Sequence, residues 1–147
     1  MLKKNKADSI SAFRDKCKQH NLSMTPQRMA IYEKLLDSKN HPCSEEIYDK
    51  VRGVFPDISL DTVYRTLSTF SEIGVIDIVE GYGEAKRYDP DVGPHHHFRC
   101  RQCNNIVDFN NESYDNLNIP KEFRKNFKVT NLRVVLEGTC DKCAKRR

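Results

Sequence analysis

The sequence predicts an α+β fold in which helices form the first half of the chain and strands form most of the second. Up to Phe70, apolar residues recur at the spacing of three and four that amphipathic helices require. After Gly74 the spacing shortens to that of strands, and glycine, proline and aspartate mark the turns. At 147 residues the chain has room for one domain or for two small ones.

The first two helices are expected before residue 40. Residues 10–20 predict a weakly patterned helix. The second helix has a clearer start, because Thr25 is a typical N-cap and Pro26 suits the first turn. Its inward-facing residues are expected to be Met29, Ile31 and Leu35 or Leu36.

Two further helices are expected before Gly74. Ser44 is followed by two glutamates and marks the start of a third helix, since acidic side chains are favourable near the positive end of the helix dipole. Pro56 interrupts the pattern, and Ser59 caps a fourth helix, which Gly74 ends. The predicted inner residues are Ile47, Tyr48 and Val51 of the third helix and Leu60, Val63, Leu67 and Phe70 of the fourth.

The rest of the chain is expected to be rich in strands. Residues 75–79 and 84–88 flank Gly81-Tyr82-Gly83 and predict a β-hairpin. Residues 89–94 are typical of a hinge, so the expected domains are 1–88 and 95–147, with 89–94 between them. Beyond the hinge we expect strands at 95–99, 105–109 and 128–137 and a short helix at 120–126.

Three helices followed by a two-stranded hairpin is the order of elements in a winged helix-turn-helix, whose recognition helix enters the DNA major groove. With its apolar residues turned inward, the helix after Ser59 would direct Arg65 toward a guanine edge. The alternative is a solvated helix face, and the pattern alone does not decide between the two. The candidate DNA-binding residues are Thr62, Tyr64, Arg65 and Ser68 on this helix, and Lys86 and Arg87 on the hairpin or wing.

The composition excludes several classes of protein. Charged residues make up 31% of the chain, and no apolar run approaches the roughly 20 residues of a membrane span. The basic start of the chain lacks the apolar region of a signal peptide, which predicts a cytoplasmic protein with no membrane partner. In that compartment, paired cysteines hold a metal or exchange electrons more often than they form disulfides. The net charge of +4 is compatible with binding to nucleic acid.

Four of the six cysteines form two Cys-x-x-Cys pairs, Cys100 with Cys103 and Cys140 with Cys143. Two such pairs can close a tetrahedral site of four thiolates, for which Zn²⁺ is the usual ion. Because the protein fills all four positions, the site would be structural. The alternative is a pair of redox-active dithiols. The remaining cysteines, Cys17 and Cys43, are expected to be small buried apolar residues.

Three of the five histidines are consecutive. On a strand, His95 and His97 face one side and His96 faces the other, so the first and third are candidate ligands and His96 is expected at the surface or behind them. Asp89 and Asp108 lie close enough in sequence to add oxygen ligands. Nitrogen and oxygen ligands favour Mn²⁺, Fe²⁺ or Zn²⁺ over copper(I). The alternative is an exposed polar strand that binds no metal.

The order and spacing of these motifs resemble the ferric uptake regulator family, and within it the peroxide-sensing repressors. The resemblance covers nearly the whole chain, from residue 24 to residue 143. The segments that carry it are Met24-Thr25-Pro26-Gln27-Arg28, Asn40-His41-Pro42, Ser59-x-x-Thr62-Val63-Tyr64-Arg65-x-Leu67, His95-x-His97, Cys100-x-x-Cys103, Ile106-Val107-Asp108-Phe109 and Cys140-x-x-Cys143.

The resemblance implies a homodimer whose N-terminal winged helices bind an operator with an inverted repeat and whose C-terminal halves dimerise. It also adds His41 to a regulatory metal site with Asp89, His95, His97 and Asp108. A metal held by both halves would fix their relative orientation, so that only the metal-loaded dimer matches the operator.

The resemblance also indicates the signal. Aspartate at position 108 is a feature that the chain shares with the peroxide sensors, since iron-uptake regulators usually carry glutamate there. Leu132 lies where the iron regulators tend to carry a histidine ligand. Arg65, in contrast, is what the iron regulators carry on the recognition helix, where many peroxide sensors have asparagine. The resemblance implies a repressor with structural Zn²⁺ and regulatory Fe²⁺ or Mn²⁺, released from DNA when peroxide oxidises His41 and His95 at the iron site.

Three other functions are open at this point. An iron- or zinc-responsive repressor would use the same scaffold. A redox enzyme or chaperone would use the cysteine pairs as dithiols, although neither pair is expected at the start of a helix after a strand, where a low thiol pKa would arise. A hydrolytic metalloenzyme would need a His-Glu-x-x-His motif or a general base near the histidines, and neither is evident. The expectation is a stoichiometric sensor and not an enzyme.

Overall fold

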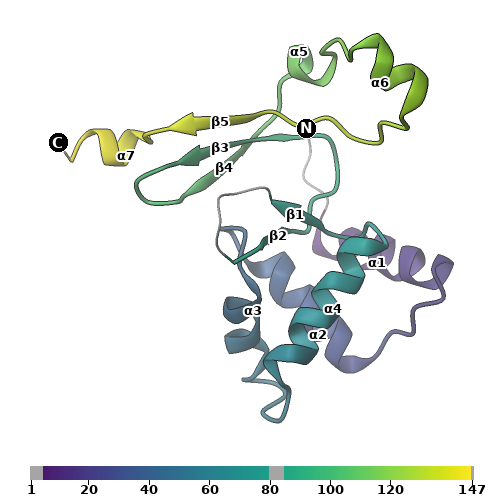
Figure 1. Ribbon diagram of the computed structural model, residues 1–147. Helices are drawn as coiled ribbons and strands as arrows, with labels where there is room; N and C mark the ends of the chain where they lie inside the picture. Colours follow the sequence, from purple (N-terminus) through teal and green to yellow (C-terminus); the bar gives the residue numbers. More distant parts are fainter. Residues whose placement is uncertain (1–4, 80–84, 147) are drawn as a thin grey trace. The chain divides into compact units, whose positions relative to one another are not determined.

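The structure is a computed structural model that describes residues 5–79 and 85–146 (Figure 1). The chain divides into two compact units, with the division between Val92 and Gly93. Within the described ranges, no helix combines the length and the apolar character needed to cross a membrane.

The first unit consists of helices and a small hairpin. Its strands β1 and β2 pair antiparallel, with Ile78 opposite Tyr88 and Asp77 opposite Asp89. The elements are α1 (Lys6–Gln19), α2 (Pro26–Asp37), α3 (Ser44–Val51), α4 (Leu60–Glu72), β1 (Asp77–Val79) and β2 (Arg87–Asp89). The order is that of a winged helix-turn-helix, with α4 as the recognition helix and β1–β2 as the wing.

Local capping signals set three helix ends as predicted. The hydroxyl of Thr25 accepts a hydrogen bond from the amide of the third residue of α2, and Ser59 does the same for Thr62 in α4. Gly74 has a φ of +79°, a conformation that glycine adopts without strain and that ends α4.

One helix start and one helix cap differ from the prediction. Helix α1 begins four residues earlier than expected, at Lys6, because the side chain of Asn5 accepts the amide hydrogen of Asp8 and caps the helix. The N-cap of α3 is Cys43 and not Ser44, since Glu46 reaches back to the amide and the thiol of Cys43 in a capping box.

The core of the first unit lies between the helices and the wing. Phe13 of α1 stacks on Tyr32 of α2 at a centroid distance of 3.7 Å, and both contact Phe70 edge-on. Cys17 is buried as predicted, and burial raises the pKa of its thiol. The buried residues of the core are Phe13, Cys17, Ile31, Tyr32, Leu35, Ile47, Val51, Ile58, Val63, Leu67, Phe70, Val75, Ile76 and Tyr88.

The inner face of α4 has four buried residues, as many as predicted, but one of the four differs. Leu60 was expected to face inward, but it is 39% exposed because it is the first residue of the helix, beyond the end of the packed stripe. Thr66 is buried instead, with its hydroxyl donating to the carbonyl of Thr62. Tyr64, one of the candidate DNA-binding residues, is 44% exposed.

The wing strands are shorter than predicted. Val75 and Ile76 are buried in the core before β1 begins, and β2 begins at Arg87. The predicted turn at Gly81-Tyr82-Gly83 and Glu84 lie outside the described residues. Strand β2 includes Asp89, so the first residue of the predicted hinge is part of the wing.

The second unit is a three-stranded sheet with short helices. Strand β3 lies between β4, with which it pairs antiparallel, and β5, with which it pairs parallel (Figure 1). The elements are β3 (His96–Cys100), β4 (Ile106–Phe109), α5 (Glu112–Asp115), α6 (Lys121–Asn126), β5 (Val135–Gly138) and α7 (Asp141–Ala144). Helices α5 and α7 were not predicted.

The last strand is much shorter than the predicted 128–137. The carbonyl of Val134 accepts from the backbone amide of His97, but its amide donates to Nδ1 of His96 at 2.9 Å, and the strand itself begins at Val135. Pairing across the sheet places Val107, Phe98 and Leu136 in one row, and Asp108, His97 and Val135 in the next. Because successive side chains alternate, these rows lie on opposite faces of the sheet.

Replacing Ser59 with alanine should destabilise the first unit by about 1 kcal/mol, because the N-terminus of α4 loses its side-chain cap. Urea unfolding followed by circular dichroism measures this change. Ser11→Ala, at an exposed position inside α1, is the control and should not lower the urea midpoint. Equal effects of the two substitutions would show that the Ser59 cap contributes nothing to stability.

Candidate metal centres and DNA-binding surface

The four cysteines of the two Cys-x-x-Cys pairs meet at one end of the sheet. Their sulfur atoms all lie within 4.8 Å of one another, and the sulfurs of Cys103 and Cys140 are 3.8 Å apart. A tetrahedral site with zinc–sulfur bonds of about 2.3 Å has sulfur–sulfur edges of about 3.8 Å. The arrangement therefore fits a structural Zn²⁺ ion held by four thiolates.

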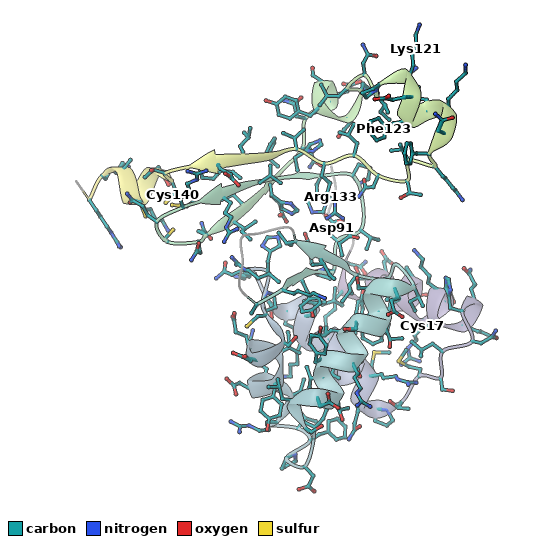
Figure 2. All side chains as sticks on the ribbon, in the orientation of Figure 1. Cys17, Asp91, Lys121, Phe123, Arg133 and Cys140 are labelled. Carbon is teal, nitrogen blue, oxygen red and sulfur yellow. The ribbon has the colours of Figure 1, made fainter. Side chains whose placement is uncertain are left out.

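Sheet and turn geometry build this cluster. Cys100 ends β3, and the turn after it returns through Asn104, whose φ of 60° is left-handed. Cys140 lies between β5 and α7 and is labelled in Figure 2. Its amide donates to the sulfur of Cys100 at 3.4 Å, and its own sulfur accepts from the amide of Cys143.

Hydrogen bonds within the cluster also separate the thiol pKa values. Donation from the amides of Cys103 and Cys140 lowers the pKa of the Cys100 thiol to about 6. The hydrogen bond with the sulfur of Cys140 raises the pKa of the Cys143 thiol to about 12. Four thiolates this close together repel one another unless a cation neutralises their charge. Zn²⁺, a divalent ion that binds thiolate sulfur well, can do this.

The position of Cys140 differs from the prediction. Neither pair was expected to begin a helix after a strand, yet Cys140 follows β5 and caps α7. The position of Cys140 therefore does not exclude dithiol chemistry. The gathering of all four sulfurs does favour a metal, since a redox dithiol needs only its own pair.

A second group of ligands lies around Asp108 in the second unit. Asp108 is directly opposite His97 in the β3–β4 pairing, and its Oδ1 is 3.0 Å from Nε2 of His97. The same oxygen is 4.0 Å from Nε2 of His95, and the two imidazole rings are in edge-to-face contact. Nδ1 of His95 is 2.7 Å from the carbonyl of Gly93 and donates to it, which leaves Nε2 as the ligand atom.

His96, expected either at the surface or behind the two candidate ligands, is fully buried, so the surface position is wrong. Its Nδ1 accepts from the amide of Val134, so the proton is on Nε2, which donates to Asp115 at 2.7 Å. Both ring nitrogens are therefore used, and His96 fastens β3 to α5 and to the start of β5. Of the three consecutive histidines, only His95 and His97 present a nitrogen atom to Asp108.

In the first unit, His41 and Asp89 form a buried pair. Nε2 of His41 is 3.3 Å from Oδ2 of Asp89, while Oδ1 of Asp89 accepts the amide hydrogen of Asp91. Both side chains are less than 10% exposed. An imidazole nitrogen and a carboxylate oxygen in contact are suitable ligands for Fe²⁺, Mn²⁺ or Zn²⁺.

The predicted DNA-binding residues occupy the outer side of α4 and the wing. Arg65 is highly exposed, with its guanidinium 2.9 Å from the carboxylate of Asp61 one turn earlier. The ammonium group of Lys86 lies 5.9 Å from the ring of Tyr64, so the wing and the recognition helix meet at this surface. Thr62 and Ser68 are half-buried, and the hydroxyl of Thr62 is bonded to that of Ser59.

Arg87 was also predicted to contact DNA, but its guanidinium is bonded within the protein. Nε donates to the carbonyl of His41 at 2.7 Å, and Nη2 donates to the carbonyl of Asn40. Sequence reasoning missed this contact, because nothing local in the sequence shows that the loop before α3 lies beside β2. The periodicity of the chain likewise gave no signal for His41.

The chain is similar to known proteins over most of its length. Residues 19–137 match the model of the Ferric uptake regulator family. The peroxide operon regulator of Bacillus subtilis is 36% identical over 130 residues, which cover 88% of this chain and 89% of that protein. A solved peroxide stress regulator from Campylobacter jejuni aligns with a TM-score of 0.67 at 29% identity, covering 86% of this chain and 95% of that one. A solved zinc-bound manganese uptake regulator aligns with a TM-score of 0.64 at 26% identity, covering 87% of this chain and 98% of that one.

Replacing Cys140 with serine should remove the bound zinc and lower the thermal stability of the second unit, because the binding free energy of a structural metal is also folding free energy. Zinc content by atomic emission and melting by calorimetry measure the two effects. Cys43→Ser is the matched control, since Cys43 caps α3 and lies outside the four-sulfur cluster. Stoichiometric zinc in Cys140→Ser would overturn the assignment.

Proposed function

Because the chain belongs to the ferric uptake regulator family, we propose that it is a metal-dependent transcriptional repressor that peroxide releases from operator DNA. The observation that carries the proposal is the position of Asp108, whose carboxylate oxygen lies near the Nε2 atoms of both His95 and His97. The names of the Bacillus subtilis and Campylobacter jejuni relatives support peroxide as the signal. The protein is a regulator and not an enzyme.

The regulatory metal site of this proposal has five ligand residues. They occur as one pair in the first unit and one group in the second, and a single cation would take ligands from both. The donors are imidazole nitrogens and carboxylate oxygens, which suit Fe²⁺ and Mn²⁺. The ligand residues are His41, Asp89, His95, His97 and Asp108.

Release from DNA follows from the loss of these ligands. When Fe²⁺ is bound, it supplies the one-electron chemistry that reduces peroxide beside the imidazoles, whereas Mn²⁺ holds the site without that reaction. In our proposal His41 and His95 are the residues oxidised. An oxidised imidazole is a poorer ligand, so the units lose the shared ion that fixes their orientation and the dimer no longer matches its operator.

A homodimer formed by the second unit is the second part of the proposal. Strand β5 is at one edge of the described sheet, and an edge strand offers its outer backbone groups to a second chain. Exposed apolar side chains lie on the sheet and around α6, where Phe123 (labelled in Figure 2) stacks on Phe127. Burying this surface between two copies would present two recognition helices to an inverted repeat.

An iron-responsive repressor is the second candidate. The observation that favours it is Arg65, the residue that iron regulators carry at this place on the recognition helix by the resemblance described above. Arg65 would determine which operator sequence the protein binds, whereas Asp108 would determine how the bound metal reacts. We therefore propose peroxide as the signal.

Arg65→Ala should cost about 1–3 kcal/mol in operator binding and should relax the preference for one base pair in each half-site, because Arg65 is proposed to read a base edge. Lys86→Ala should instead weaken binding to all sequences and reduce the salt dependence, because Lys86 is proposed to contact phosphate. Both effects can be measured by fluorescence anisotropy with Mn²⁺-loaded protein. A uniform loss of affinity for operator and random DNA in Arg65→Ala would contradict the base-reading role.

Asp108→Glu should keep metal-dependent operator binding but lose most of the sensitivity to peroxide, because the longer carboxylate changes how the ligand reaches the metal. The experiment loads both proteins with Fe²⁺, adds peroxide, and follows DNA binding together with the masses of the peptides that contain His41 and His95. The parent protein should gain one oxygen atom on either peptide and leave the DNA.

Mn²⁺-loaded protein is the control and should show neither change after peroxide. If the Fe²⁺-loaded parent protein gains no oxygen on these peptides and stays bound to its operator, the peroxide proposal is wrong and the iron-responsive alternative is favoured.

A further inference from the structure

The backbone at His41 is held in a conformation that its sequence does not favour. His41 has a φ of 51°, in the left-handed region that residues with a side chain rarely adopt. It also precedes Pro42, and the proline ring further restricts the backbone of the residue before it. A residue in this state keeps it only when contacts around it hold the backbone in place.

Arg87 of the wing supplies those contacts. Its Nε donates to the carbonyl of His41 at 2.7 Å, and its Nη2 donates to the carbonyl of Asn40. A planar guanidinium can hold two successive carbonyls in one fixed orientation, which the single ammonium group of a lysine cannot do. The two carbonyls belong to the peptide groups before and after the α-carbon of His41, the strained residue.

The backbone of β2 completes the attachment. Cys43 forms a bridge with Arg87, and the amide of Tyr88 donates to the carbonyl of Pro42 at 3.0 Å. The next residue of β2, Asp89, contacts the imidazole of His41. Of three consecutive residues of β2, Arg87 and Tyr88 therefore bind the backbone of the His41 loop, and Asp89 contacts the imidazole of His41.

We infer that Arg87 is a positioning residue for metal binding, which keeps the backbone of His41 in the strained conformation that directs its imidazole to Asp89. The inference rests on the proposed role of His41 as a ligand of the regulatory metal. It gives the wing a second function, because the strand that follows the DNA-contacting Lys86 also sets the geometry of a metal ligand. Arg87 itself does not touch the metal.

The test uses the full-length zinc-containing protein and Mn²⁺ as the probe. Arg87→Ala should weaken Mn²⁺ binding by about 10–100-fold, the range expected when a residue that orients a ligand is lost. Arg87→Lys should recover part of the affinity, since lysine can donate to one of the two carbonyls. Ethylguanidinium, which matches the part of the side chain removed in Arg87→Ala, should restore binding by that variant and leave the parent protein unchanged.

Two controls separate positioning from a general loss of structure. Arg52→Ala, which removes a guanidinium paired with Asp49 at the surface of α3, should leave Mn²⁺ affinity unchanged. Before Mn²⁺ is added, the imidazole resonances of His41 should shift in Arg87→Ala and return with ethylguanidinium, while zinc content stays at one per chain. A loss of affinity that neither ethylguanidinium nor Arg87→Lys reverses would overturn the inference.

His41→Ala distinguishes failure of the inference from failure of the proposed function. If His41→Ala weakens Mn²⁺ binding and Arg87→Ala does not, His41 is a ligand and Arg87 does not position it. If His41→Ala leaves Mn²⁺ affinity unchanged, the proposed ligand set is wrong, and the role of Arg87 in metal binding is overturned with it.

Discussion

Strand β3 must pair with a strand on each side, and this double pairing fixes both groups of ligands in the second unit. On one side the register sets His97 opposite Asp108, and on the other it sets Cys100 opposite Gly138, two residues before Cys140. A slip of one residue against β4 would turn Asp108 away from His97, because side chains alternate between the faces. The stretch from His95 to Cys103 therefore contributes to two separate sites, one at each end of the same strand.

In our proposal, the wing has a comparable double role in the first unit. One side of the wing, at Lys86, meets Tyr64 of the recognition helix, and β2 holds the loop that carries His41. A residue proposed to contact DNA and a residue proposed to bind the metal therefore lie close together on the wing, since Lys86 and Asp89 are three positions apart. In our proposal, occupancy of the metal site changes DNA binding through the orientation of whole units, and no residue needs to contact both ligands.

The sequence predicted those features of the structure that depend on residues close to one another along the chain. The caps at Thr25 and Ser59, the end of α4 at Gly74 and the opposite directions of His96 and His97 all follow from short-range geometry. What the sequence could not show depends on contacts between distant segments. The amide of Val134 bonds to the ring of His96, which shortens β5, and the guanidinium of Arg87 bonds to the His41 loop, which changes the predicted role of that arginine.

The central claim is that one metal ion takes ligands from both units. Pulsed electron paramagnetic resonance of bound Mn²⁺, with histidines labelled by ¹⁵N, measures it directly by the nitrogen nuclei coupled to the ion. The account predicts one Mn²⁺ per chain, and His41→Ala and His97→Ala should each remove one histidine nitrogen from the same spectrum. The account would be contradicted if His41→Ala left the nitrogen couplings unchanged, or if two Mn²⁺ ions bound per chain and each substitution affected only one of them.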